Sequence, residues 1–217
     1  MKLAAEREAV AAACRRLAAE GLVIQTAGNV SVRAEGDLVV VTPTGGVFEE
    51  LEAEQMTVLD RGGQVVDGPF APTSELALHL GVYDRFDHAG AVVHTHSPMA
   101  TALSCVVDEV PAVHYSMLSI GGTVPVADYA TFGTEELARN VVAALEGGPA
   151  TLMRSHGATT YGLDLDGAVE ASRLLEWACA VYWRARMIGD PVVLSQEQLQ
   201  DVVRVVQERS YGRLSEA

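Results

Sequence analysis

Residues 91–98 read AVVHTHSP and place two histidines one residue apart at the end of an apolar run. Side chains at i and i+2 of a β-strand point to the same face of the sheet, so we expect His94 and His96 to lie side by side. Two imidazoles held in this way supply half of the ligands that a tetrahedral zinc site needs. Taken alone, such a pair is more often two polar strand residues with their own hydrogen bonds, so other residues must decide between the two interpretations.

The size and charge of the chain narrow the classes of function. Its 217 residues match one domain with a substantial core, and we predict a single domain over residues 1–217. Hydrophobic residues make up 49% and charged residues 20% of the chain, as in soluble globular proteins. The formal net charge of −14 argues against nucleic-acid binding, because a phosphate backbone needs a basic face.

Cysteine usage and hydropathy bear on the location of the protein. Cys14, Cys105 and Cys179 lie far apart and are odd in number, which argues against a disulfide framework and for reduced thiols. No apolar run has the length of a membrane span, and the N-terminal residues lack the apolar stretch of a signal peptide. The sequence therefore predicts a cytoplasmic protein that does not bind a membrane.

Helical and strand patterns are mixed along the chain, without repeats or linkers. We predict helices over residues 2–20, 75–86, 98–105, 134–145, 166–188 and 195–209. We predict strands over residues 30–33, 38–42, 58–60, 64–66, 91–94, 121–126 and 150–155. Ser74 and Thr134 are expected to cap the helices that follow them. Because several neighbouring strands form hairpins, we expect an α/β fold with a mostly antiparallel sheet covered by helices.

Two further residues join the histidine pair as candidate metal ligands. His156 follows a predicted strand and precedes a glycine, where backbone can pass close to a site. Glu75 begins a helix, where a carboxylate is stabilised by the helix dipole and can bind a metal or act as a base; by itself it is more often only a helix-terminal carboxylate. His79, one turn further on, is a rival ligand that we assign to packing around the site. His88 and His114 are expected to be ordinary polar residues.

Three short segments offer donors for an anion. Gly28-Asn29 precedes a strand, and Thr73-Ser74 precedes a helix, where phosphate groups often bind. The run Thr42-Pro43-Thr44-Gly45-Gly46 offers hydroxyls and glycine amides in a nest-like turn. Each segment alone is usually only a turn. Together they suggest an anion site built from neutral donors, with little arginine.

These motifs resemble the class II sugar-phosphate aldolases of the fuculose-1-phosphate aldolase type, in the aldolase and ribulose-phosphate 4-epimerase superfamily. The matching segments, in order along essentially the whole chain, are Gly28-Asn29-Val30-Ser31, Thr42-Pro43-Thr44-Gly45, Thr73-Ser74-Glu75, His94-Thr95-His96-Ser97, His114-Tyr115, Tyr129-Ala130-Thr131-Phe132-Gly133-Thr134, His156-Gly157 and Tyr211-Gly212. The combination is specific, although no single segment is. It implies a three-layer α/β/α fold with a central, mainly antiparallel sheet.

The resemblance also implies roles for individual residues. Zn²⁺ is expected to be bound by Glu75, His94, His96 and His156. Phosphate is expected to be bound by Gly28, Asn29, Thr44, Gly45, Thr73 and Ser74. Glu75 then leaves the metal and acts as the base, and Tyr115 protonates the aldehyde oxygen in the site of a neighbouring subunit. Phe132 and Tyr211 shape the aldehyde pocket, and the protein is expected to be a cyclic homotetramer with sites between subunits.

The expected activity is reversible, zinc-dependent cleavage of a ketose 1-phosphate to dihydroxyacetone phosphate and a small aldehyde. A related metal-dependent activity, methylthioribulose-1-phosphate dehydratase or ribulose-phosphate 4-epimerase, is the alternative within the superfamily. The 4-epimerases tend to carry Asp at the position of Glu75, which favours the aldolase. A non-catalytic binding domain on the same fold is the third possibility, and it is expected to lack the metal ligands that this chain retains.

Overall fold

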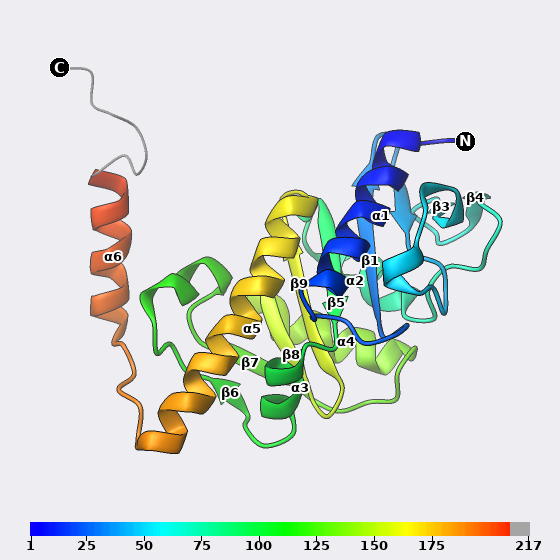
Figure 1. Ribbon diagram of the computed structural model, residues 1–217. Helices are drawn as coiled ribbons and strands as arrows, with labels where there is room; N and C mark the ends of the chain where they lie inside the picture. Colours follow the sequence, from blue (N-terminus) through cyan, green and yellow to red (C-terminus); the bar gives the residue numbers. More distant parts are fainter. Residues whose placement is uncertain (209–217) are drawn as a thin grey trace.

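A central sheet of nine strands organises the computed structural model, which describes residues 1–208 (Figure 1). The strands are β1 (Gly28–Ala34), β2 (Leu38–Val41), β3 (Thr57–Leu59), β4 (Val65–Asp67), β5 (Ala91–Thr95), β6 (Glu109–Val110), β7 (Val124–Ala127), β8 (Ala150–Met153) and β9 (Gly157–Gly162). Their order across the sheet is β4-β3-β2-β1-β5-β9-β8-β7-β6. In this part of the chain only the β7–β8 pair is parallel, which confirms the predicted mainly antiparallel sheet.

Helices cover both faces of the sheet (Figure 1). One face carries α1 (Ala4–Ala19), α3 (Pro98–Ser104) and α5 (Leu165–Ile188), and the other carries α2 (Leu76–Arg85) and α4 (Glu135–Ala144). Short 3₁₀ turns lie at η1 (Phe48–Glu50), η2 (Ala53–Gln55), η3 (Tyr115–Ile120) and η4 (Leu145–Gly147). The last helix, α6 (Gln196–Glu208), stands apart from the sheet beside η3. The three-layer prediction is therefore confirmed.

Alternation along β5 decides which side chains face which layer. Ala91 and Val93 belong to the core beneath α1, whereas Val92 belongs to the core beneath α2 and α4. Burying each valine stabilises the fold by roughly 1.5–3 kcal/mol, so the register of this strand is strongly specified. His94 continues the Val92 side by the two-residue period of the strand. The end of β5 therefore presents His94 toward the layer that contains α2.

The start of α2 differs from the prediction. Ser74 was expected to cap this helix, but the N-cap position is occupied by Glu75, with no side-chain cap hydrogen bond. The Glu75 N–H donates a hydrogen bond to the hydroxyl oxygen of Thr73 at 3.2 Å, so this amide is satisfied by a side chain two residues earlier. The Glu75 carboxylate is therefore free to point away from its own helix. The predicted cap at Thr134 is confirmed, since its hydroxyl accepts from the Leu137 N–H.

Two strands were not predicted, and both lack the usual sequence signal. β6 is only two residues long, and β9 reads GATTYG, with a glycine at each end and little apolar character. β9 nevertheless lies between β5 and β8 in the middle of the sheet. The strand expected over residues 121–126 starts later, at Val124, because Gly121 and Gly122 adopt positive φ angles in a turn. None of the helices within residues 1–208 combines the length and apolarity needed to cross a membrane.

Candidate metal centre and anion pocket

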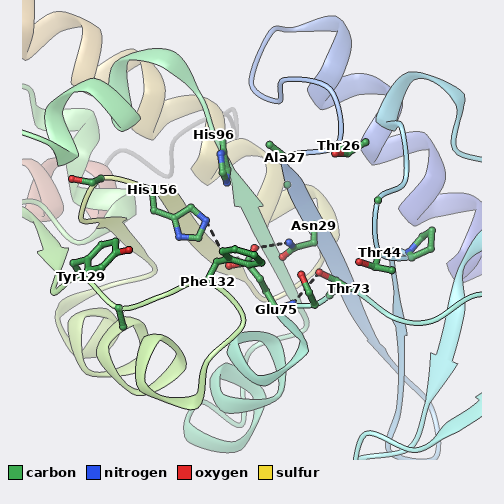
Figure 2. A pocket seen from close by; sticks show the side chains of 16 residues that line it. Thr26, Ala27, Asn29, Thr44, Thr73, Glu75, His96, Tyr129, Phe132 and His156 are labelled. Carbon is green, nitrogen blue, oxygen red and sulfur yellow. Dashed lines mark hydrogen bonds and ion pairs between the residues drawn. The ribbon is translucent and has the colours of Figure 1, made fainter.

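Three histidines converge at one end of the strand pair β5–β9. His94 is the next-to-last residue of β5, His96 follows two residues later, and His156 lies in the turn between β8 and β9. One ring nitrogen from each residue lies within 4.8 Å of the other two. His94 Nε2 and His96 Nε2 are 3.0 Å apart, which confirms that the His-x-His pair faces one site. Figure 2 shows the His156 ring directed toward Glu75, with a dashed line between the two side chains.

Tight backbone packing brings His156 to this position. Ser155 adopts the left-handed conformation with φ 52°, which turns the chain at the end of β8. A Cβ at Gly157 would lie 2.3 Å from the Thr95 carbonyl oxygen, so the residue after His156 must be glycine for the turn to lie against β5. This packing is the close approach of the backbone to the site that was predicted for the glycine after His156.

Glu75 approaches the three histidines from the start of helix α2, which packs against the sheet. Its Oε2 accepts a hydrogen bond from Asn29 Nδ2 at 2.9 Å and lies 3.2 Å from His94 Nε2. Its Oε1 is buried, lies 3.6 Å from His156 Nε2 and has no hydrogen-bond partner in the structure. The carboxylate is thus anchored through one oxygen and unsatisfied at the other. An unsatisfied buried carboxylate oxygen is costly, and a cation or a substrate proton would relieve it.

The hydrogen bonds around His94 test whether a metal ion fits. The Ala158 carbonyl oxygen lies 2.9 Å from His94 Nδ1 and can only accept, so Nδ1 carries the hydrogen. The lone pair of neutral His94 is then on Nε2, which points at His96 Nε2 and at the Glu75 carboxylate. Several lone pairs that converge in this way repel one another unless a proton or a cation lies among them. A three-histidine, one-carboxylate donor set suits Zn²⁺ and similar divalent ions.

The pKa values in the site follow from burial and from these neighbours. Burial, followed by the charges of His94 and His156, lowers the pKa of His96 to about 3. Burial, followed by the charge of His94, lowers the pKa of His156 to about 4. These two imidazoles are therefore neutral near pH 7, the form that binds metals.

Glu75 and His94 form a coupled pair with opposite shifts. Burial acts to raise the pKa of Glu75, but His94 and the Asn29 amide outweigh it and hold the pKa below its usual range. Burial acts to lower the pKa of His94, but the Glu75 carboxylate outweighs it and the net shift is upward. Both directions mean that the site favours an ionised carboxylate and a positive charge beside it, as a metal cation supplies.

A cavity of about 340 Å³ opens in front of the centre (Figure 2). The predicted residues that line it are Gly28, Asn29, Thr44, Gly45, Thr73, Ser74, Glu75, His96, Phe132 and His156. The structure thus brings all three segments predicted to bind an anion together beside the histidine cluster. Within residues 1–208, no lysine or arginine lines this cavity, and its polar lining consists of hydroxyls, amides, the Glu75 carboxylate and two imidazoles. His94 lies behind this surface and is fully buried.

Some residues that line the cavity were not singled out as site residues. They are Thr26, Ala27, Pro43, Tyr129, Ala130 and Ser155. Most of them are sequence neighbours of predicted residues, and Tyr129 and Ala130 stand in the same motif as Phe132. Tyr129 and Phe132 are 62% and 66% exposed, so both aromatic rings lie at the open edge of the cavity. Proximity to a recognised motif was the signal that could have identified them.

One predicted site residue, Tyr115, lies away from this cavity. Tyr115 begins η3, is 52% exposed and lies beside His114, with ring centroids 4.5 Å apart. It contributes to a different groove, between η3 and α6. Tyr211 lies outside the described residues. The remaining histidines behave as expected: His79 is fully buried behind the site, His88 packs near Phe86, and the His114 ring accepts from the Ser116 N–H.

Comparisons with known proteins agree with this geometry. Residues 8–183 match the family described as Class II Aldolase and Adducin N-terminal domain. The chain is 37% identical to the L-fuculose phosphate aldolase of Escherichia coli (strain K12), over 92% of each protein. It is 36% identical to the 5-methylthioribulose-1-phosphate/5-deoxyribulose-1-phosphate aldolase of Rhodospirillum rubrum, over 92% of this chain and 89% of that protein. A solved L-fuculose 1-phosphate aldolase matches with a TM-score of 0.90 at 34% identity, over 94% and 96% of the two chains.

Proposed function

The chain belongs to the class II aldolase and adducin N-terminal domain family and is an enzyme of the class II aldolase type, and we propose that it reversibly cleaves a ketose 1-phosphate to dihydroxyacetone phosphate and a small aldehyde, with zinc as its metal. Membership of the family bears out the resemblance that the motifs indicated. The observation that carries the proposal is the Glu75 carboxylate. It has one anchored and one unpaired oxygen, beside three histidines and at the wall of a cavity lined with neutral donors.

The metal would be held by His94, His96 and His156, with Glu75 as a ligand that substrate can displace. A divalent cation held by these residues supplies Lewis-acid polarisation of a substrate carbonyl. The hydrogen bond from His94 Nδ1 to the Ala158 carbonyl orients that imidazole, as outer hydrogen bonds do in many metal sites. Because the Glu75 carboxylate lies beside the histidine cluster, the same side chain is proposed both as a metal ligand and as the general base.

Glu75 is proposed as the general base. In the condensation direction it takes a proton from the hydroxymethyl carbon of dihydroxyacetone phosphate, and in cleavage it returns that proton. Its Oε2 is fixed by Asn29, so the unpaired Oε1 is the oxygen left for the proton. A positioned carboxylate of this kind contributes typically 10²–10⁴-fold to a proton transfer.

Phosphate is proposed to bind where hydroxyls and amides line the cavity, at Asn29, Thr44, Gly45, Thr73 and Ser74. The Thr73 hydroxyl oxygen already accepts from the Glu75 N–H, so its own hydrogen is available to donate. Such contacts fix the position of the substrate relative to Glu75, which lowers the entropic part of the barrier. Phe132, at the cavity edge, is placed to contact the aldehyde.

Tyr115 is proposed to act in a neighbouring subunit of a cyclic homotetramer, where its hydroxyl protonates the aldehyde oxygen during condensation. Its exposure and its absence from the cavity of its own chain support a role in another subunit. A closed ring supplies every site with one such tyrosine.

A product assay tests the proposal. The zinc-loaded protein is incubated with L-fuculose, L-rhamnulose, ribulose and 5-deoxyribulose 1-phosphates. The names of two relatives contain the fuculose and 5-deoxyribulose phosphates. Dihydroxyacetone phosphate is measured by coupled NADH oxidation, and the aldehyde by NMR. Equal amounts of both products from at least one ketose are expected. A dehydrated or epimerised product without dihydroxyacetone phosphate would instead support the dehydratase or epimerase alternatives, and turnover of no substrate would support a binding domain.

A further inference from the structure

A buried row of polar side chains runs from Glu75 into the interior between β1 and α2. Asn29 Nδ2 donates to Glu75 Oε2 at 2.9 Å, and Asn29 Oδ1 lies 2.6 Å from His79 Nε2. His79 Nδ1 lies 2.6 Å from Ser31 Oγ, which in turn lies 2.8 Å from the Tyr83 hydroxyl. All five side chains are buried. The site residues described above account for only the first two members of this row.

The row forms because two residues along β1 and four residues along α2 span nearly the same distance. Asn29 and Ser31 are two residues apart on one face of β1, a step of about 6.6 Å. Glu75, His79 and Tyr83 are four residues apart along α2, a step of about 6.0 Å. Because the two steps are nearly equal, the strand and helix residues stay paired along the whole contact.

The pairing continues past the row itself. Arg33 is the next residue on the same face of β1, and its guanidinium donates to the Tyr83 carbonyl at 2.7 Å and lies 4.9 Å from the ring centroid. This contact fixes the far end of the row on the outside of the α2 layer. The row is therefore held at both ends, by Arg33 and by the metal centre.

The carboxylate gives every hydrogen bond in the row one direction. An ionised Glu75 can only accept, so Asn29 must present its N–H to Glu75 and its carbonyl oxygen to His79. That oxygen accepts, so His79 Nε2 carries the hydrogen and Nδ1 accepts from Ser31. The single Ser31 hydrogen is then used, and Ser31 accepts from the Tyr83 hydroxyl.

The charge states of the two buried titratable groups agree with this direction. Burial lowers the pKa of His79 to about 3, so its imidazole is neutral and has one donor and one acceptor nitrogen. Burial raises the pKa of the Tyr83 phenol, so its hydroxyl keeps the hydrogen that it donates. Every hydrogen bond within the row therefore joins one donor to one acceptor, and such matched buried networks specify one arrangement.

We propose that His79, supported by Ser31 and Tyr83, is a positioning residue that locks the Asn29 amide in the orientation that anchors Glu75. Without the His79 N–H, the Asn29 amide has no partner for its oxygen and is free to flip, which would turn that oxygen toward the carboxylate and repel it. The inference rests on the proposed function, in that Glu75 is the base and metal ligand whose orientation is being held.

A second consequence concerns the ligand. Asn29 has two N–H hydrogens, of which Glu75 uses one, and Asn29 also lines the cavity. Its second N–H is available to an oxygen of a bound anion. The same amide orientation therefore serves both the carboxylate and the substrate, and His79 controls that orientation.

Two substitutions at His79 separate positioning from packing. His79→Leu fills much of the space but has no donor, whereas His79→Gln offers an amide N–H near the place of Nε2. We expect His79→Leu to lower kcat and the affinity for Co²⁺ by roughly 10–100-fold, the usual cost of removing an outer partner of a metal ligand, and His79→Gln to restore most of both. Co²⁺ affinity is measured on metal-free protein by visible absorption, and kcat with the ketose phosphate that is cleaved fastest.

Milder substitutions further along the row test the same role if the His79 variants do not fold. Ser31→Ala leaves Nδ1 without its donor and is expected to give a smaller loss, and Tyr83→Phe a smaller one still. Tyr161→Phe is the matched control, because Tyr161 is a buried tyrosine of β9 that packs on Phe86 outside the row. It is expected to leave kcat and Co²⁺ affinity unchanged.

The outcomes distinguish the two proposals. A folded His79→Leu protein with wild-type kcat and Co²⁺ affinity overturns the positioning role, as does equal loss in the Leu and Gln variants. If the wild-type protein cleaves no ketose phosphate, the proposed function fails, but the Co²⁺ titrations still decide whether His79 orients Glu75.

Discussion

His94 Nε2 lies 3.2 Å from Glu75 Oε2, although His94 belongs to the central strand β5 and Glu75 is the N-cap of helix α2, on the α2/α4 face of the sheet. The His94 ring is fixed from behind by the Ala158 carbonyl, and the carboxylate is fixed by Asn29. These two hydrogen bonds hold the carboxylate and the His94 ring next to each other inside the protein. This contact ties the metal centre to the proposed base, and the predictions below depend on it.

Removal of one imidazole tests the metal centre. His96→Ala deletes one of three converging nitrogens, so the protein as purified is expected to lose most of the roughly one zinc per chain that a four-ligand site holds. Metal content is measured by mass spectrometry, with His88→Ala as the control, since His88 packs near Phe86 away from the centre. Full activity of the wild-type protein after chelation, with no transition metal bound, would contradict the prediction.

Glu75→Gln tests the base. The amide keeps the size of the side chain but cannot take a proton, so proton exchange at the hydroxymethyl carbon of dihydroxyacetone phosphate is expected to fall by roughly 10²-fold or more. The exchange is followed by NMR in D₂O, in protein whose metal content has been matched to the wild type. Unchanged exchange would assign the base to another residue.

Ser74→Ala tests phosphate recognition by neutral donors. Ser74 lines a cavity to which the described part of the chain contributes no lysine or arginine, so each hydroxyl is expected to carry a large share of the phosphate binding. The loss of one hydrogen bond to a charged group is expected to weaken binding by about 1.5–3 kcal/mol, which raises KM for the phosphorylated ketose by roughly 10–150-fold. The unphosphorylated ketose is the internal control and should bind equally to both proteins. Equal KM values for the phosphorylated ketose would remove Ser74 from the phosphate site.

Mixing two inactive proteins tests the assignment of Tyr115. Tyr115→Phe keeps the exposed ring but loses the hydroxyl, and Glu75→Gln loses the base, so each protein alone is expected to be nearly inactive. After subunit exchange, some interfaces pair an intact Tyr115 with an intact Glu75, and part of the activity should return. Exchange is confirmed by mass spectrometry of a mixed assembly. A fully active monomer, or confirmed exchange without recovered activity, would place the acid elsewhere.

Acid sensitivity tests the buried state of His79. Its pKa is lowered from its ordinary 6.5 to about 3 by burial, so between these values the unfolded chain binds a proton that the folded protein does not. Folding stability therefore falls as pH drops from 6.5 toward 3, by up to roughly 1.4 kcal/mol per pH unit from this residue. Urea unfolding of metal-free protein is expected to show a shallower pH dependence for His79→Gln than for the wild type. Parallel profiles would mean that His79 is protonated in the folded protein.

Local rules were enough to predict much of the site. The two-residue period of a strand placed His94 and His96 on one face, and the hydroxyl at Thr134 identified its helix start correctly. The hairpin of β1 and β2 followed from its turn residues. In each case the interacting atoms belong to the same or to neighbouring elements, so the chain geometry alone determines them.

Long-range contacts decided what local rules did not. β9 was missed because GATTYG has little apolar character, and it is a strand because β5 and β8 supply hydrogen bonds on both sides. Glu75, rather than Ser74, takes the N-cap position of α2, and its carboxylate turns to His94 and Asn29 in other elements. A local pattern carries no information about such partners, because they are set by how the layers pack.

The sequence by itself identified the residues that meet at the candidate site: the histidines, the carboxylate and the hydroxyl segments are recognisable from residue type and spacing. Only the tertiary structure decided how they are oriented. It left Oε1 of Glu75 unpaired and built the row from Asn29 through His79 to Tyr83, because the steps of β1 and α2 match only when helix and strand are packed together. Hydrogen-bond direction in a buried row depends on every neighbour at once, and that condition exists only in the folded protein.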